Sequence, residues 1–375
     1  MLLVMACAIV GGLLLVDNKQ QVKVFSTKLL FDHVPHRKQV QLQKLNMLAV
    51  AKREKELAFW LSVVGPKALM DDLLADSGGG ASLDCHQEAH IIGRVSYELY
   101  GGEVFSEGTS LCHSGFYHGA MEAFLKEKGT VNLAKNMTAL CNTFATGFGK
   151  FECYHGVGHG VLAYEDYDLP KALLLCKDMP DTSAKSSCFG GAFMENIMVA
   201  NGQGASLEHT TVWVNNDPLF PCTYFEGDET IEGTCYAMQT SRMLMLYGNN
   251  FDRVRQECLK VRDQMRGVCF RSIGRDAAGV VLRDPTQIIH ICKRNDVSDA
   301  LVDQCIIGAL NVIVDFWGEK LDGQANEYCR VMPGEHKNIC YATLAKRLPE
   351  VFPVKSDRDQ RCQMFEQFYQ YLCKK

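Results

Sequence analysis

The segment that decides the fold is residues 168–201, which read DLPKALLLCKDMPDTSAKSSCFGGAFMENIMVAN. Its first half carries apolar residues at helical spacing and stops at Pro180, a residue that helix interiors do not tolerate. Its second half begins another helix just before Cys188. Cys176 therefore lies near the end of one helix and Cys188 near the start of the next. At such a turn the Cα separation of about 5.5 Å that a disulfide requires is within reach.

The same plan recurs in residues 250–280, 284–318 and 322–352. Sixteen of the 17 cysteines, all except Cys7, fall into eight pairs, seven of them 11 to 13 positions apart and the first 27 apart. The predicted pairs are Cys85 with Cys112, Cys141 with Cys153, Cys176 with Cys188, Cys222 with Cys235, Cys258 with Cys269, Cys292 with Cys305, Cys329 with Cys340, and Cys362 with Cys373. Helix pairs repeating at about 35 residues predict an all-α solenoid of about eight antiparallel hairpins, each stapled by one disulfide.

In period and topology this pattern resembles the tetratricopeptide class of helical repeats. The resemblance implies stacked helix pairs whose apolar faces are buried on their neighbours. It extends no further than period and topology, because the Trp, Tyr and Pro pattern of that class is not present, and it assigns no functional residue.

The cysteine spacing also indicates the compartment. No CxxC motif occurs in the chain, which excludes zinc ribbons, thioredoxin-like redox motifs and covalent haem attachment. Regular pairs then predict disulfides, and so an oxidising extracytoplasmic location. The 39 basic and 44 acidic residues give a net charge of -5 and form no basic stripe, so a nucleic-acid partner is not expected.

Residues 1–16, MLLVMACAIVGGLLLV, are apolar and uncharged, and predict a signal peptide or a signal anchor to the membrane. Lys19, Lys23 and Lys28 follow this run and no basic residue precedes it, which the positive-inside rule would interpret as the opposite orientation. We give the cysteine spacing more weight and expect a membrane-anchored or secreted protein. The VMAC run at 4–7 resembles a lipoprotein cleavage site, but the apolar run continues past Cys7.

Residues 17–80 predict an amphipathic helical stem with a glycine-rich linker. The stem has helical patterns at 40–64 and 66–74, and the linker is the SGGG run at 77–80. The repeat domain is expected over 81–375, with its histidine-rich units at 81–166.

Six of the 11 histidines lie within residues 85–159, where an even distribution would place about two. His86 and His90, like His155 and His159, are four residues apart, which puts both imidazoles within about 40° on one helix face. The predicted ligands of a transition metal (zinc, iron, copper or nickel) are His86, His90, His118, His155 and His159. His113 is the weakest candidate. A lone helical histidine is usually a core or surface residue, so the prediction depends on the clustering.

Carboxylates accompany the histidines. Glu122 follows His118 by four residues, so its carboxylate is expected to be able to join the imidazoles as a ligand, and Glu88 lies between His86 and His90. Glu88, Glu165 and Asp166 are expected to orient the imidazoles.

Position six after the second cysteine of each pair is polar in nearly every unit, which predicts one shared face that is exposed or lines a groove. Its residues are His118, His159, Met194, Ser241, Arg275, Asn311 and Lys346.

Glycines surround the histidines, and each costs a helix about 1 kcal/mol relative to Ala. They are Gly115, Gly119, Gly156, Gly158 and Gly160. Close packing of helices and a ligand that approaches the backbone are the two explanations. Arg94 and the neighbours Arg275 and Asp276 are expected in ion pairs, and His209, His290 and His336 receive no role.

Two functions fit these patterns. The favoured one is a binding or scaffold module for a protein, peptide or glycan, with the metal as a structural or ligand-presenting element. The alternative is a metal-dependent hydrolase or oxidoreductase with Glu122 or Glu88 as general base. We favour the module because no catalytic motif accompanies the histidines.

Overall fold

A computed structural model describes residues 50–76, 85–106, 108, 112, 114–202, 210–281, 283–317 and 323–374. All of them belong to one compact unit that begins at Gln39. Within these ranges every regular element is a helix, as the cysteine and apolar spacing predicts. The predicted anchor at 1–16, the stem up to residue 49 and the linker at 77–80 lie outside the described residues. No helix in the described part of the chain is long and apolar enough to span a membrane.

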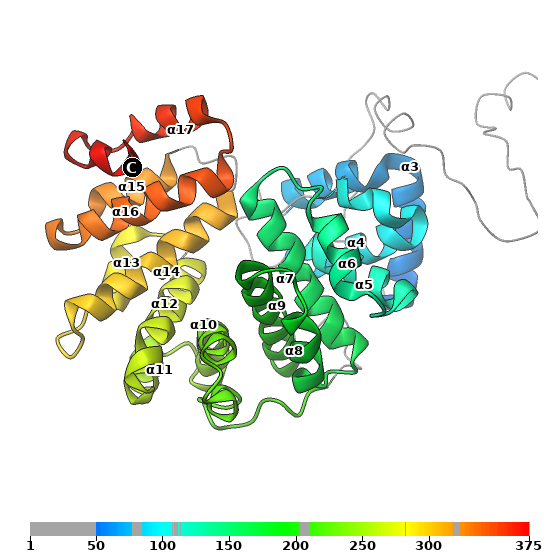
Figure 1. Cartoon of the computed structure of the whole chain (residues 1–375), viewed down its shortest axis with the longest axis horizontal. Helices are drawn as coiled ribbons and strands as arrows, with labels where there is room; N and C mark the ends of the chain where they lie inside the picture. Colours follow the sequence, from blue (N-terminus) through cyan, green and yellow to red (C-terminus); the bar gives the residue numbers. More distant parts are fainter. Residues whose placement is uncertain are drawn as a thin grey trace, which may run out of the picture. The chain divides into compact units, whose positions relative to one another are not determined.

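Five of the predicted hairpins are present (Figure 1). In each, a short first helix ends at or beside one cysteine and a longer second helix carries its partner near the start. The pairs are α6 (Leu133–Cys141) with α7 (Gly147–Tyr164), α8 (Leu169–Lys177) with α9 (Thr182–Ala200), α11 (Phe251–Lys260) with α12 (Asp263–Val280), α13 (Pro285–Cys292) with α14 (Asp299–Trp317), and α15 (Gln324–Val331) with α16 (Gly334–Val351). Asp168 and Asp181 each cap the following helix by accepting a hydrogen bond from a backbone N–H.

All eight predicted disulfides are confirmed. They join Cys85 to Cys112, Cys141 to Cys153, Cys176 to Cys188, Cys222 to Cys235, Cys258 to Cys269, Cys292 to Cys305, Cys329 to Cys340, and Cys362 to Cys373. Their Cα–Cα distances run from 5.4 to 5.8 Å, close to the separation expected at a stapled turn. A loop of about a dozen residues closed in this way stabilises the fold by roughly 3 kcal/mol through the lost entropy of the unfolded chain. The cysteines are therefore the main constraint within each unit.

The second cysteine of a pair occupies an equivalent place in successive units. Cys235 in α10 (Glu229–Leu246), Cys269 in α12 and Cys340 in α16 each lie in the second turn of a long helix. All three are buried in the core. Each bridge therefore ties the apolar face of a long helix to the segment that precedes it.

Three units are not the helix hairpins predicted for them. Cys85 and Cys112 precede α4 (His86–Tyr100) and α5 (Gly115–Lys128), so their disulfide joins the first ends of two long helices. Cys222 lies in the short 3-10 helix η3 (Cys222–Phe225), before α10 and its partner Cys235. Cys362 ends α17 (Lys355–Cys362), and Cys373 lies in the 3-10 helix η5 (Gln367–Lys374).

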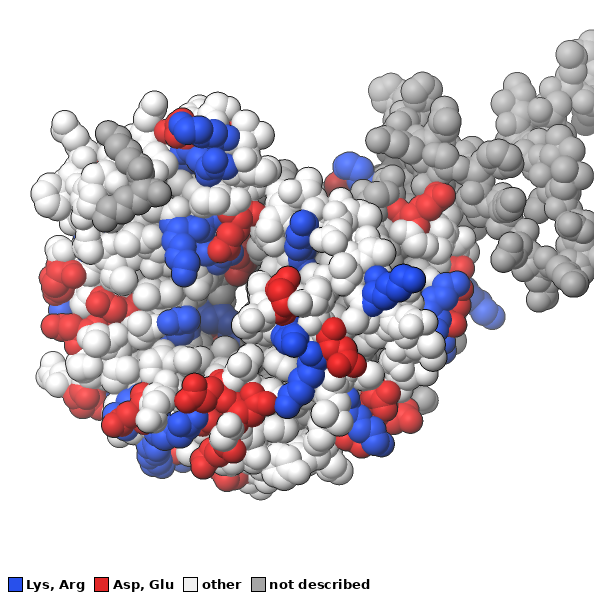
Figure 2. Space-filling view, viewed as in Figure 1, with Lys and Arg blue, Asp and Glu red and all other residues white. Residues whose placement is uncertain are grey.

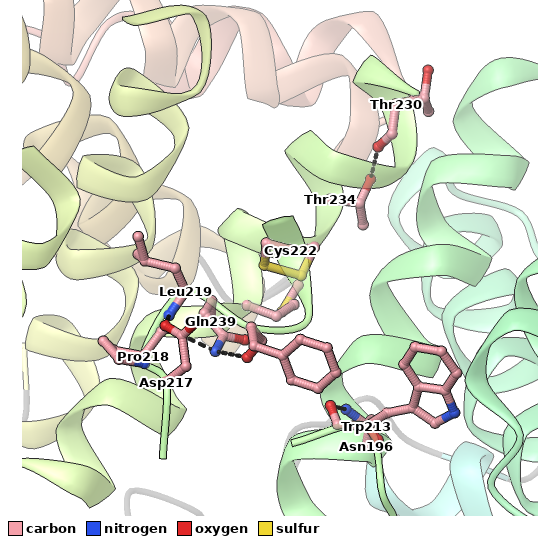
Figure 3. The surroundings of a disulfide bond; sticks show 12 residues. Asn196, Trp213, Asp217, Pro218, Leu219, Cys222, Thr230, Thr234 and Gln239 are labelled. Atoms are coloured by element: carbon pink, nitrogen blue, oxygen red, sulfur yellow. Dashed lines mark hydrogen bonds between the residues drawn. A yellow bond between two sulfur atoms is a disulfide. The ribbon is translucent and has the colours of Figure 1, made fainter. Parts of the chain in front are cut away.

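The unit of Cys222 differs because its first half carries turn residues in place of a helical pattern. Pro218 and Pro221 both lack the backbone N–H that a helix needs. Carbonyls outside a helix must find other donors. The buried side-chain amide of Gln239 donates to the carbonyls of Pro218 (2.9 Å) and Phe220 (2.8 Å), as seen around the disulfide in Figure 3.

Helix α3 (Val50–Asp76) packs against α4 and belongs to the same unit, although the sequence predicts a stem there. It breaks at Gly65 (φ 80°), just before Pro66, so the two predicted helical patterns meet at this residue. Leu61 and Leu69 are fully buried. The predicted ion pair of Arg94 is confirmed, and its partner is Glu54 on α3.

The long helices contact one another in chain order, from α5 through α7, α9, α10, α12 and α14 to α16. Helix α16 also contacts α7, where Gly147 lies against Glu350. A solenoid in which each unit touches only its neighbours would lack this contact. The helices from α7 to α16 thus form a closed cycle of contacts.

Glycines let neighbouring helices meet backbone to backbone. A Cβ on Gly158 would lie 2.0 Å from the carbonyl oxygen of Cys188, and a Cβ on Gly191 would lie 1.9 Å from that of His155. The same reciprocal arrangement joins α4 to α5 and α12 to α14, through Gly93, Gly119, Gly274 and Gly308. Close helix packing therefore accounts for Gly119 and Gly158.

Basic and acidic side chains are interspersed over the face shown in Figure 2. Some pair between neighbouring units, as Lys293 does with Glu335 (2.9 Å) and Lys177 with Asp228 (2.9 Å). Exposed pairs of this kind contribute about 0–1 kcal/mol each. Disulfides and the apolar core therefore contribute more to the stability of the fold.

We expect Gly274→Ala to lower the free energy of unfolding by about 1–3 kcal/mol, because its Cβ would meet the Cys305 carbonyl oxygen at 1.8 Å. Gly279→Ala on the same helix is the matched control. No atom lies within 4 Å of its Cβ, so stability should stay unchanged or rise by up to about 1 kcal/mol. Denaturant unfolding of the oxidised protein measures both, and equal effects would contradict the packing argument.

Candidate metal centre

Four histidines meet between three long helices. His90 lies on α4, His118 on α5, and His155 and His159 on α7. All four are buried, with exposed fractions of 5%, 1%, 5% and 2% respectively. The side chain of His86 and the whole of His113 lie outside the described residues.

Three of these histidines form a compact group. Nitrogen atoms of His118, His155 and His159 all lie within 4.8 Å of one another. The rings of His118 and His159 stack with centroids 3.9 Å apart, and the ring of His155 lies 5.4 Å from the first and 5.0 Å from the second. The ring of His90 is 6.3 Å from that of His118. Of the five predicted ligands, three therefore meet at one point and His90 lies beside them.

Glycines on α7 explain why α5 comes so near. A Cβ on Gly156 would lie 3.5 Å from the carbonyl oxygen of Tyr117 and 3.7 Å from Cδ2 of His118. Gly158 packs against α9 on another face of the same helix. The sequence HGVGH from His155 to His159 thus places two imidazoles one turn apart, with small residues between them that admit both neighbouring helices.

Glu195 on α9 orients one imidazole, a role that the sequence pattern did not predict for it. Its Oε2 lies 2.9 Å from Nδ1 of His159, and its Oε1 accepts a hydrogen bond from the Tyr167 hydroxyl at 3.1 Å. A carboxylate accepts, so Nδ1 of His159 carries the proton and Nε2 is the atom available to an ion. The only signal in the sequence is a single acidic residue in the apolar run AFMENIM.

The predicted orienting carboxylates at the end of α7 are not the ones used. Glu165 is the residue at the C-terminal cap of α7, and Asp166 is exposed. The chain turns there through two residues with positive φ, Asp166 and Tyr167, which buries the ring of Tyr167. Glu195, 36 residues after His159 in the sequence, takes the expected role.

Glu122 and Glu88 occupy different surroundings. Oε2 of Glu122 lies 3.7 Å from Nδ1 of His90. Burial is the main cause that raises the pKa of Glu122 to about 7. Arg94 opposes this shift, and the charge of Glu195 adds to it. Glu88 is half-buried on α4 and does not belong to the group of three histidines.

The column at position six is predicted to be exposed or to line a groove. His118 and His159 are buried, so the exposed alternative is wrong for the histidine-rich units. In later units the column is partly exposed, and Lys346 is exposed. Column residues of two adjacent helices also touch in a later unit. Arg275 donates a hydrogen bond to Ser241 at 2.5 Å, and the equivalent residues of the earlier units, His159 and His118, stack their rings. The predicted ion pair of Arg275 with Asp276 is confirmed at 2.6 Å.

The remaining histidines lie elsewhere. His336 on α16 is buried, with Nδ1 2.7 Å from Oδ1 of Asp303, which gives this ring a structural partner. His290 is exposed on α13, and His209 lies outside the described residues.

Three imidazoles suit zinc, iron or copper, and in a tetrahedral site they leave a fourth position for water or substrate. Comparisons of the chain with protein-family models, curated proteins and solved structures found no match. The function must therefore be inferred from the geometry of the site.

We expect Glu195→Gln to weaken zinc binding by about 10- to 100-fold, because the amide no longer accepts the His159 proton as a carboxylate does. Tyr167→Phe should cause a smaller loss. Competition titration with a chromophoric chelator measures both.

Asp303→Asn is the matched control. It makes the same carboxylate-to-amide change at the partner of another buried histidine, His336, which is not one of the three grouped histidines. Its zinc affinity should equal that of the unmodified protein. Wild-type affinity in Glu195→Gln would show that Glu195 does not support a metal ligand.

Proposed function

We propose that this chain is an extracytoplasmic helical repeat protein that binds a transition-metal ion through His118, His155 and His159, and serves as a binding or scaffold module. The observation that carries the proposal is the set of three buried imidazole nitrogens within 4.8 Å of one another. Eight intramolecular disulfides support an oxidising compartment.

The spacing is compatible with an ion after small side-chain movements. Bonds of 2.0–2.1 Å at tetrahedral angles place ligand nitrogens about 3.4 Å apart. Nitrogens within 4.8 Å reach that separation by shifts of about 1 Å, which rotation of the imidazoles supplies. Zinc, iron and copper all accept imidazole ligands.

A metal at this point would join two units that no disulfide joins. Helix α5 follows the Cys85–Cys112 disulfide, whereas α7 belongs to the Cys141–Cys153 hairpin. The ion would cross-link these helices as the disulfides cross-link each hairpin. The burial of all three rings supports this structural role, because it shields the ion from solvent.

The wider setting of the module is proposed from the sequence alone. Residues 1–16 provide the proposed attachment to a membrane, or the signal for secretion. A protein, peptide or glycan is the proposed ligand of the repeat surface, since helical repeats commonly present extended binding faces.

A metal-dependent enzyme is the second candidate, and one observation favours it. Glu122 is a largely buried carboxyl next to His90, with a pKa of about 7, a value that suits a general base or acid at neutral pH. A three-histidine site also keeps a coordination position open. Hydrolysis or oxidation at that position would require access for a substrate.

We expect His118→Ala and His159→Ala each to lose the ion of the three-histidine group, as measured by elemental mass spectrometry of the oxidised protein. His290→Ala, an exposed histidine on α13, should keep its metal content. Absence of bound metal in the unmodified protein after zinc loading would contradict the proposal. The cobalt(II) spectrum separates the two functions, since azide changes the spectrum of an open site and leaves that of a closed one unchanged.

Zinc affinity should also fall as the pH drops, because the imidazoles must be unprotonated to bind the ion. Titrations between pH 5 and pH 8 test this. If the zinc affinity did not change across that range, histidine ligands would be excluded.

A further inference from the structure

We propose that the site holds a second divalent ion, with His90 on α4 and Glu122 on α5 as its ligands, beside the ion of the three-histidine group. The inference rests on the proposed function, because the two ions would share one buried polar cluster. It adds a ligand pair from α4 and α5 to the site.

The distance between the two groups suits a shared ion. Nδ1 of His90 and Oε2 of Glu122 are 3.7 Å apart, which is longer than a hydrogen bond. Two ligands of one zinc ion, with bonds of 2.0–2.2 Å, lie about 3.4 Å apart. The side chains are largely shielded, with 6% and 17% of their surfaces exposed. An imidazole and a carboxylate therefore face each other at near ligand-to-ligand spacing inside the protein.

This pair is separate from the first group. The atoms within 4.8 Å of one another belong to His118, His155 and His159, and neither His90 nor Glu122 is among them. The ring of His118 lies between, 6.3 Å from that of His90 and 3.9 Å from that of His159. A second ion would bind them where they lie.

The charges around the pair favour a cation. Glu122 and Glu195 are both largely buried and repel each other, and Glu98 adds negative charge. The positive charges of Arg94 and Lys126 lower the pKa of Glu122, but Arg94 also pairs with Glu54. A divalent ion next to Glu122 would stabilise its ionised form, as the charge of Arg94 does.

Helix packing holds the two ligands in register. A Cβ on Gly119 would lie 1.8 Å from the carbonyl oxygen of His90, so α4 and α5 touch at the level of the ligand itself. Glu122 follows Gly119 by one turn, and the Cys85–Cys112 disulfide joins the first ends of both helices. The backbone positions of both residues are therefore set by helix packing before any ion binds.

Mixed imidazole and carboxylate ligands suit zinc, manganese(II) and iron(II). Two neighbouring ions can together bind and polarise the oxygen atoms of a small ligand such as water or hydroxide. The second ion would therefore bring the site closer to hydrolytic chemistry than the three-histidine group alone.

The test is zinc stoichiometry, measured by elemental mass spectrometry and by calorimetric titration of the demetallated, oxidised full chain. We expect two zinc ions per chain for the unmodified protein. His90→Ala and Glu122→Gln should each bind one, with the affinity of the remaining ion changed less than tenfold. His290→Ala is the control and should bind two. Helical circular dichroism and thiol titration verify that each variant is folded and oxidised.

The outcomes separate this inference from the proposed function. One zinc ion in the unmodified protein, lost in His118→Ala and kept in His90→Ala, would overturn the second ion and leave the first. Two ions that both persist in His90→Ala and Glu122→Gln would also overturn the assignment. No bound zinc would overturn both. If a variant fails to fold, copper(II) loading of the unmodified protein decides, because two ions this close broaden each other's electron paramagnetic resonance spectra and a single ion does not.

Discussion

The close approach of neighbouring long helices is the constraint on which the rest of this structure depends. Reciprocal glycines remove the side chains that would separate the backbones, as Gly158 and Gly191 do between α7 and α9. Helices that pack through glycine lie closer than helices that pack through larger side chains. Imidazoles beside such contacts, like that of His155, are therefore buried and brought close to neighbouring rings.

Disulfides and histidines act at different places in the fold. Each disulfide fixes a turn or a pair of helix ends within one unit, where the two cysteines are close in the sequence. The histidine cluster lies between units, where no disulfide is present. Burying so many polar groups is costly unless they are paired. The hydrogen bonds from His159 and Tyr167 to Glu195 supply part of that pairing.

The repeat explains how one scaffold places different chemistry at equivalent points. Arg275 contacts Ser241 across α12 and α10 at the positions where His159 stacks on His118 across α7 and α5. An ion-pair and hydroxyl network fills this contact between α10 and α12, and imidazoles fill it between α5 and α7. Side-chain identity at the shared position, more than the backbone, decides which units can hold a metal.

The sequence by itself determined what depends on local spacing. Cysteines 11 to 13 residues apart, such as Cys258 and Cys269, predicted the disulfides. The four-residue step from His155 to His159 put two imidazoles on one helix face. Both the cysteine and the histidine spacing reflect the geometry of a single turn or helix, so the sequence alone predicts their consequences. Only the tertiary structure decided the contact of α16 with α7, the unit of Cys222 and Cys235 without a first helix, and the partnership of Glu195 with His159. These depend on the register between helices far apart in the chain. Side-chain volumes and glycine contacts set that register, and a repeating pattern along one helix does not predict it.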